Sequence, residues 1–491
     1  MSGLDGVLML ATGTFVVALL VLLRYRFFDP DEFEHAHAAW CWSKGLIPYK
    51  DFFEHHTPWY YALLRELLRG FQVDSSFDSA RHFLLLARVL SLALAVGSLA
   101  LVTRIGRTWE SRRVGLLAAL FLITQPFFFK KNVELRPDVL ALPFFLASLW
   151  ALLRGLSPAL STGWRRRSWF VLAGLCLGGA AMCTQKMLFV LPGVLAGLGL
   201  WVLIEERWAR TMDVVLFLLA FFLPGIATGA AFARLHAVGP FIFNNFLLNA
   251  HWAYTPTWQL IRLARTSGPV MVLAGYRAYR VLPTLLRPER RNAGEALLFC
   301  LLVWLFVALL VIPAAQMQYY LMPLPLLCLF AASGLDELAE RAGRRVLPWA
   351  LVALSILPVV NFAMDAASTN QTQFARLRRV FESTTPSDLV MDGWQGAGVF
   401  RPHAFYYYFV HDELLQMMSP QRLNAFLDDL EAGRGRPALI ALDRRLVALG
   451  PRFRAFVNAN YGSRDGFFYY PADSRWLLKS APPAPSFGPI R

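Results

Sequence analysis

The chain has 491 residues, of which 56% are hydrophobic and 16% are charged, and its formal net charge is +15. Soluble domains carry about 25% charged residues, so this composition excludes an ordinary soluble protein. The positive charge does not indicate nucleic-acid binding, because the arginines stand between apolar runs, where they set orientation in a membrane.

The apolar runs predict a polytopic α-helical membrane protein with about 11 transmembrane helices, because several of them reach the ~20 residues that cross a bilayer. Residues 168–203 are too long for one span, and Thr184-Gln185-Lys186 is the polar break at which we expect the chain to turn. We read the first run as a retained anchor, because it lacks a basic n-region and a clear cleavage site. The predicted spans are 7–23, 83–103, 114–130, 138–153, 168–184, 186–203, 213–233, 268–286, 296–313, 317–334 and 346–363.

Basic residues predict which loops face the cytoplasm. By the positive-inside rule, the alternate loops that are rich in arginine face the cytoplasm. The first loop (24–82) and the region 364–491 then lie on the opposite side of the membrane. Arg24 and Arg26, directly after the first span, run against this rule. We expect an inner-membrane protein whose working surface lies on the periplasmic or extracellular side. The arginine-rich loops are 104–113, 154–167, 207–210, 277–291 and 341–345.

The C-terminal region differs in character from the apolar runs before it. Residues 388–392 and 438–443 read as short buried strands, and 419–432 reads as an amphipathic helix between them. We therefore predict two domains. They are a transmembrane catalytic module at 1–363, which includes the first external loop, and a small extracytoplasmic α/β domain at 364–491.

The first external loop opens with an unusual acidic stretch. Pro30 suits the first turn of a helix with Asp29 as its cap, and Asp31 and His35 then share a face. A carboxylate such as Asp31 at the mouth of a membrane cavity is a candidate general base. The alternative is a solvated acidic cap beneath the lipid headgroups. The other predicted residues of this substrate loop are Glu32, His35, Tyr49 and His56.

A divalent metal ion is a second possibility in the same loop. Glu54-His55-His56 offers ligand types that zinc accepts, although adjacent residues rarely bind one ion. A metal site would need a distant ligand such as His251 or His236. Most histidines outside a spacing motif are not ligands, so both readings stay open.

Other charged residues stand at the external ends of later spans. Asp138 begins a span, and an ionisable residue there is costly unless it faces a polar cavity. Lys186 is the lone charge between two apolar runs. A lysine there either pairs with a phosphate or extends its ammonium to the membrane interface. Arg136 is a second candidate for the phosphate. Tyr319 and Tyr320 either contact that phosphate or form an interfacial aromatic belt.

The same residues carry a resemblance to a known group. The chain resembles the GT-C superfamily, and most of all the bacterial family of protein O-mannosyltransferases, the lipid A aminoarabinose transferase and the rhizobial galacturonic acid transferases. The resemblance is best over residues 1–330. The pattern consists of Asp31-Glu32, His35, Gly45, Pro48-Tyr49, Asp51-Phe52-Phe53, His56 and Pro58, followed by Arg136-Pro137-Asp138.

The resemblance implies a polyprenyl-phosphate sugar donor, an external active site and, in most members, inversion at the anomeric carbon. The essential first-loop aspartate of the family would match Asp31, and its second-loop acidic residue would match Asp138. A family metal, where present, would involve Glu54 and an external histidine such as His251.

We therefore predict a glycosyltransferase, hexosyl or pentosyl, that moves a sugar from a polyprenyl-phosphate-linked donor to an extracytoplasmic lipopolysaccharide, glycan or protein, with Asp31 as general base. A lipid or polysaccharide transporter or flippase would instead show internal repeats and broken or charged helices near the midplane. A non-catalytic membrane assembly subunit would not need Asp31 and Asp138 together.

Overall fold

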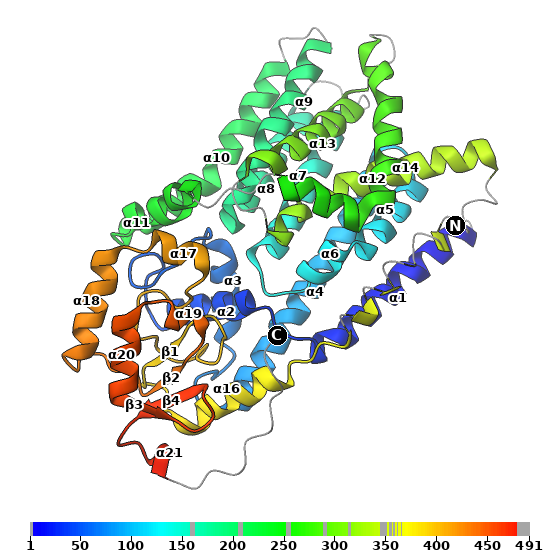
Figure 1. The fold of residues 1–491 in the computed structure, drawn as a ribbon. Helices are drawn as coiled ribbons and strands as arrows, with labels where there is room; N and C mark the ends of the chain where they lie inside the picture. Colours follow the sequence, from blue (N-terminus) through cyan, green and yellow to red (C-terminus); the bar gives the residue numbers. More distant parts are fainter. Residues whose placement is uncertain are drawn as a thin grey trace. The chain divides into compact units, whose positions relative to one another are not determined.

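A computed structural model gives the fold, which consists mostly of helices (Figure 1). The structure describes residues 3–478 apart from 158–162, 205–209, 252–256, 288–291, 313–315, 344–350, 353–355, 357–358, 361 and 365.

The chain divides into two compact units, each assembled from separate segments of the sequence. The membrane unit consists of Met1–Arg26, His55–Ala62 and Leu86–Ser368. The C-terminal unit consists of Phe27–Glu54, Leu63–Leu85 and Thr369–Arg491. Most of the predicted first external loop therefore folds together with the C-terminal region.

The membrane unit confirms the predicted helical membrane class. Every predicted span before residue 346 overlaps helix that the structure describes, whereas 346–363 falls largely outside the described residues. Six described helical stretches are long and apolar enough to cross a bilayer, which makes the chain a multi-pass membrane protein. They are Gly3–Tyr25, Phe77–Trp109, Pro137–Gly155, Gln185–Leu203, Thr211–Arg234 and Ala293–Val311.

The helices of this unit follow the apolar runs of the sequence. Two helices, α3 (Trp59–Leu68) and α4 (Phe77–Trp109), run through both units. The others are α1 (Gly3–Tyr25), α5 (Arg112–Thr124), α6 (Pro126–Lys131), α7 (Pro137–Gly155), α8 (Trp164–Cys183), η1 (Gln185–Val190), α9 (Leu191–Ile204), α10 (Thr211–Arg234), α11 (Val238–Ile242), η3 (Phe243–Leu247), η4 (Leu248–His251), α12 (Thr257–Leu286), α13 (Ala293–Val311), η6 (Met317–Leu321) and α14 (Leu324–Ala342).

Two breaks in these helices have local causes. The predicted turn after 168–184 is confirmed, because α8 ends at Cys183 and Thr184 is extended, with φ −152° and ψ 129°. The predicted span 114–130 is interrupted at Gln125, which is also extended. Pro126 follows Gln125, and a residue before proline is pushed out of the helical region.

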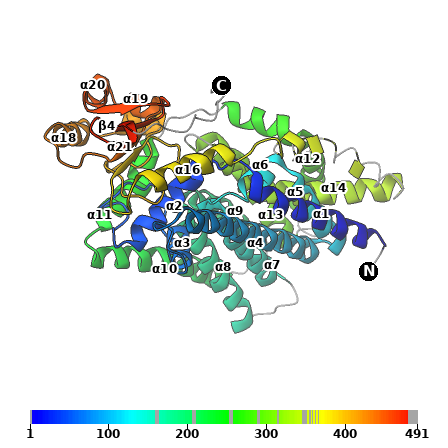
Figure 2. The ribbon, with the colours of Figure 1, turned by 90° about the horizontal axis from the view of Figure 1, so that it is seen from below.

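Glycines allow one set of helices to pack closely. Figures 1 and 2 both show α8 beside α7 and α10. A Cβ added at Gly174 or Gly178 of α8 would lie 2.2 Å from a backbone oxygen of α10, that of Phe217 or Phe221. Only glycine fits at such a contact, which is how membrane helices gain packing energy without a hydrophobic driving force between them.

An ion-pair network joins helices at the arginine-rich side of the membrane unit. Arg277, in the predicted span 268–286, lies in α12, and its Nη2 is 2.9 Å from Glu295 of α13 and 3.7 Å from Glu110. Its Nη1 is 3.8 Å from Glu337 of α14. The arginine is therefore neutralised by carboxylates, which is the usual solution for charge near a membrane interior.

The C-terminal unit contains the small α/β fold that the sequence predicts. Its sheet has the order β1-β2-β4-β3, with β1 (Val390–Asp392) and β2 (Leu439–Ala441) parallel and the other pairs antiparallel. Helices α18 (Pro420–Glu431) and α20 (Pro451–Asn460) pack on each other beside the sheet (Figure 1). The remaining elements are α2 (Pro30–Ser43), α16 (Gln371–Ser383), α17 (Asp412–Met417), α19 (Arg444–Val447), β3 (Tyr461–Ser463), β4 (Phe468–Pro471) and α21 (Arg475–Leu478).

Candidate active site

The acidic stretch forms the first turn of α2, as the sequence predicts. The Asp29 side chain caps the helix by accepting from the Asp31 amide at 3.2 Å, and the Glu32 carboxylate accepts from the Asp29 amide at 2.9 Å. This reciprocal pair is a capping box, which fixes the start of the helix. The Asp31 side chain is partly exposed, whereas His35 is buried. Of the predicted acid–base residues in this turn, Asp31 is therefore the one that is accessible to solvent.

A second part of the predicted substrate loop follows α2. Tyr49 is buried and has φ +70°, a left-handed conformation that is uncommon for a bulky residue and marks a strained position. Tyr406 holds this conformation by donating its hydroxyl to the Tyr49 carbonyl at 2.7 Å. The Tyr406 carbonyl also accepts from the Phe53 amide at 3.0 Å, which fixes the backbone just before Glu54.

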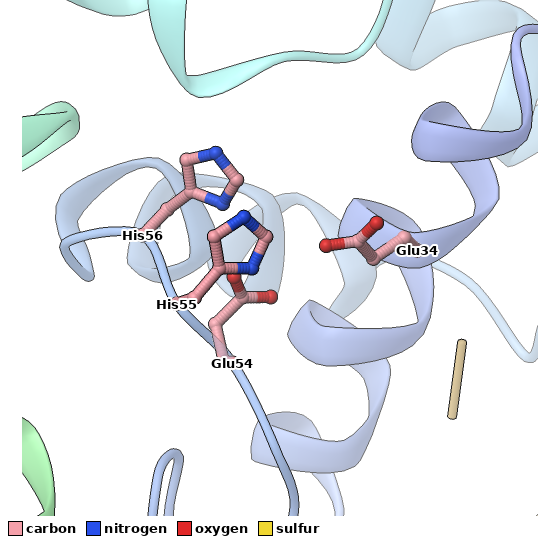
Figure 3. A group of neighbouring side chains, drawn as sticks. All are labelled: Glu34, Glu54, His55 and His56. Carbon is pink, nitrogen blue, oxygen red and sulfur yellow. The ribbon is translucent and has the colours of Figure 1, made fainter. Parts of the chain in front are cut away.

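The candidate metal ligands of this loop are Glu34, Glu54, His55 and His56. One ligand atom from each lies within 4.8 Å of the others (Figure 3). Glu34 comes from α2, and the other three residues are consecutive. Two carboxylates and two imidazoles are a donor set that zinc accepts. Among the described residues this group does not include the predicted ligand His251, whose Nδ1 is 2.8 Å from the Leu247 carbonyl.

In the membrane unit, one buried carboxylate forms ion pairs with three cationic side chains. Glu134 lies in the turn between α6 and α7 and is 2% exposed. Its oxygens are 3.0 Å from Arg26 Nη2, 3.0 Å from Lys131 Nζ and 2.7 Å from Arg136 Nε. Arg26 also donates to the Lys130 carbonyl at 3.0 Å. This contact explains why Arg26 stands outside the first span, against the positive-inside rule.

The predicted residues Asp138 and Lys186 form a second buried ion pair in this unit. Lys186 Nζ lies 3.2 Å and 3.3 Å from the two carboxylate oxygens of Asp138. The same ammonium lies 4.3 Å from the centroid of the Tyr319 ring, which is a cation–π contact. Tyr320 faces another partner, because its hydroxyl donates to Gln259 Oε1 at 2.7 Å. The structure thus brings Asp138, Lys186 and Tyr319 together.

Two side chains bind the backbone of His55 within the membrane unit. Gln185 Nε2 donates to the His55 carbonyl at 2.8 Å, and Asn249 Nδ2 donates to the same oxygen at 2.9 Å. Gln185 directly precedes Lys186, so one short segment contacts the first loop and carries the candidate phosphate-binding amine. These contacts join segments that the sequence analysis treated separately.

Several residues of the candidate site were not predicted from the sequence, or were not singled out there. Arg26 was an exception to the charge rule, and Lys131 was not among the predicted site residues. Glu34 was one acidic residue among several. The signal that identifies them is burial together with ion pairing, and neither is visible before the fold. That Asp31 and Asp138 share one pocket stays a prediction, since they belong to different units.

Comparisons with known proteins agree with this architecture. Residues 81–230 match the family described as dolichyl-phosphate-mannose-protein mannosyltransferase, and no curated protein sequence matches the chain. The structure of ArnT from Cupriavidus metallidurans bound to undecaprenyl phosphate has a TM-score of 0.65 at 15% identity and covers 97% of this chain and 99% of that chain. Its apo state gives a TM-score of 0.67 at 15% identity, covering 98% and 100%.

A third similar structure comes from an archaeon. The oligosaccharyltransferase of Archaeoglobus fulgidus in its apo form has a TM-score of 0.64 at 13% identity, and the match covers 96% of this chain and 74% of that one. The same protein in complex with Zn and sulfate has a TM-score of 0.58 at 12% identity, covering 95% and 73%. These matches confirm the resemblance to the GT-C superfamily, and the chain has the fold of its glycosyltransferases.

Proposed function

We propose that this protein is a glycosyltransferase that moves a sugar from a polyprenyl-phosphate donor to an acceptor hydroxyl outside the cytoplasm. The acceptor is a lipopolysaccharide, another glycan or a protein, and the membrane is a bacterial inner membrane. The observation that carries the proposal is the buried group of cations around Glu134 and Asp138. Two similar structures contain undecaprenyl phosphate or dolichol phosphate, which supports a lipid-linked donor.

The cation group is suited to a phosphate on a lipid anchor. The ion pairs described above contain four cations (Arg26, Lys131, Arg136 and Lys186) and two carboxylates. A site that holds cations in fixed positions before the reaction stabilises the negative charge that develops on a leaving phosphate. We assign this role first to Lys186 and Arg136. Asp138 orients the Lys186 ammonium through both carboxylate oxygens.

The proposed reaction is a single displacement with Asp31 as general base. The acceptor oxygen attacks the anomeric carbon, and the bond between that carbon and the phosphate oxygen breaks. Asp31 takes the proton of the acceptor hydroxyl, and the lipid phosphate leaves with the electron pair. The partial exposure of Asp31 at the capped start of α2 suits a group that must reach an incoming acceptor.

A divalent metal ion fits the group formed by Glu34, Glu54, His55 and His56. Their mixed carboxylate and imidazole ligands favour zinc over magnesium, which prefers oxygen ligands alone. Such an ion, when bound, would supply positive charge for the phosphate. In this proposal Glu54 and His56 act as ligands.

The test is sugar transfer by the purified 491-residue chain. A lipid extract from cells fed radiolabelled glucose serves as donor, and membranes from the same cells serve as acceptor. We expect Asp31→Asn to lower transfer by about 10²–10⁴-fold, the usual contribution of a general base. The matched control is Asp78→Asn, an exposed aspartate at the start of α4. Normal transfer by Asp31→Asn would remove Asp31 from the mechanism.

A further inference from the structure

One glutamine of the C-terminal unit holds the backbone just before α2. The Phe28 amide donates to Gln373 Oε1 at 2.7 Å, and Gln373 Nε2 donates to the Phe28 carbonyl at 2.8 Å. The two residues are 345 positions apart in the sequence. Gln373 lies in α16 and is 7% exposed. A buried side-chain amide that satisfies both groups of one peptide residue is a specific, two-point clamp.

The clamp acts where the proposed catalytic helix begins. Phe28 directly precedes Asp29, the cap of α2, and Asp31 is the second residue of that helix. The Phe28 side chain is fully buried, and its ring packs on Phe33 at 5.3 Å and on Phe374 at 5.5 Å between centroids. Because Phe374 follows Gln373 in α16, one turn of α16 fixes both the backbone and the side chain of Phe28.

The rest of α2 is held by the same part of the chain. His37 Nδ1 lies 2.9 Å from the Val399 carbonyl, and its ring stacks on Tyr408 with centroids 3.7 Å apart. Gly396 has φ +77°, and a Cβ there would lie 2.1 Å from the Phe33 ring, so the loop after β1 packs directly on α2. These contacts bury α2 beyond its first turn. Among the polar ones, the Gln373 clamp is nearest to Asp31 in the sequence.

We propose that Gln373 is a positioning residue for the transfer reaction, acting on Asp31 through the Phe28 backbone. This inference rests on the proposed function, in which Asp31 is the general base. A base must come within hydrogen-bond reach of the proton it takes. The clamp fixes the start of α2 against α16. It therefore fixes the position and orientation of the Asp31 carboxylate relative to the acceptor hydroxyl. In this view the C-terminal unit is part of the catalytic assembly.

The variant that tests this is Gln373→Leu, which keeps the volume and removes both hydrogen bonds. We expect kcat for the transfer described above to fall roughly 10- to 100-fold, as small displacements of reacting groups do, with an unchanged KM for the lipid-linked donor. Gln373→Glu keeps the acceptor for the Phe28 amide and should lose less. The matched control is Gln371→Leu, an exposed glutamine at the start of α16, which should transfer normally.

Two further measurements separate positioning from general damage. In an Asp31→Asn background, Gln373→Leu should cause no further fall in kcat, because both changes act on one step. Amide hydrogen exchange should become faster at residues 29–35 in Gln373→Leu and stay unchanged in Gln371→Leu. The inference is overturned if Gln373→Leu keeps full kcat, or if it lowers kcat equally in both backgrounds. An active Asp31→Asn variant would instead overturn the proposed function, whatever the exchange data show.

Discussion

The Glu134 carboxylate gives the sharpest test of the proposed phosphate site. Glu134→Gln keeps the shape of the side chain but removes its charge from between Arg26, Lys131 and Arg136. Removing one partner of a buried ion pair usually costs 3–5 kcal/mol, so we expect a destabilisation of about 3–5 kcal/mol. The control is Glu66→Gln, whose half-exposed pair with Arg69 should be worth less than about 1 kcal/mol.

The same variant should bind a lipid phosphate more tightly. A negative charge about 8 Å from a phosphate, at an effective dielectric constant of about 20, opposes binding by about 2 kcal/mol. Loss of the Glu134 charge should therefore lower the Kd of undecaprenyl phosphate by at least about tenfold. Tryptophan fluorescence in detergent would report both the thermal midpoint and the titration with this lipid. An equal or weaker affinity would refute the reasoning, because it would show that the Glu134 charge does not oppose the binding of the lipid phosphate.

Two other predictions concern the C-terminal unit and the metal. Burial lowers the pKa of His37 from 6.5 to about 3. Below pH 6.5 the unfolded chain therefore binds a proton at His37 and the folded chain does not. The free energy of unfolding consequently decreases as the pH falls from 6.5 toward 3. His37→Gln should reduce this slope by up to about 1.4 kcal/mol per pH unit in thermal unfolding, and an unchanged slope would refute the prediction. Glu34→Gln should lower the zinc content of protein dialysed against zinc, whereas Glu382→Gln should leave it unchanged, and equal zinc in both would dismiss the site.

Features set by local chemistry could be predicted from the sequence. The cap at Asp29 followed from a proline one residue later, and the turn at Thr184 followed from the length of an apolar run that no single span can hold. The two parallel strands and the helix between them followed from hydrophobic patterning. The break at Gln125 could also have been predicted from Pro126, which follows it. It was missed because the residues on both sides form one continuous apolar run.

Features set by distant partners could not be predicted. Arg26 and Glu134 are 108 residues apart, and each alone reads as an ordinary interfacial charge. The Gln373 clamp is even harder to predict from the sequence. A side-chain amide that hydrogen-bonds to a backbone does not require any particular residue type at the partner position. Asp138 and Lys186 were each identified as site residues, but their separation of 48 positions in the sequence gives no sign that they form one ion pair.

Each unit, taken by itself, holds the residues proposed for the reaction by a different kind of contact. The membrane unit holds its cations with buried carboxylates, so that their positions are set before a phosphate arrives and little reorganisation is needed when charge develops. The C-terminal unit holds the helix that carries Asp31 through backbone clamps and ring contacts, which carry no charge. In the proposed reaction those contacts do not involve the donor, so we expect a different acceptor to require changes in the C-terminal unit and not in the cation group. That separation gives a physical reason why one fold can serve transferases with different acceptors.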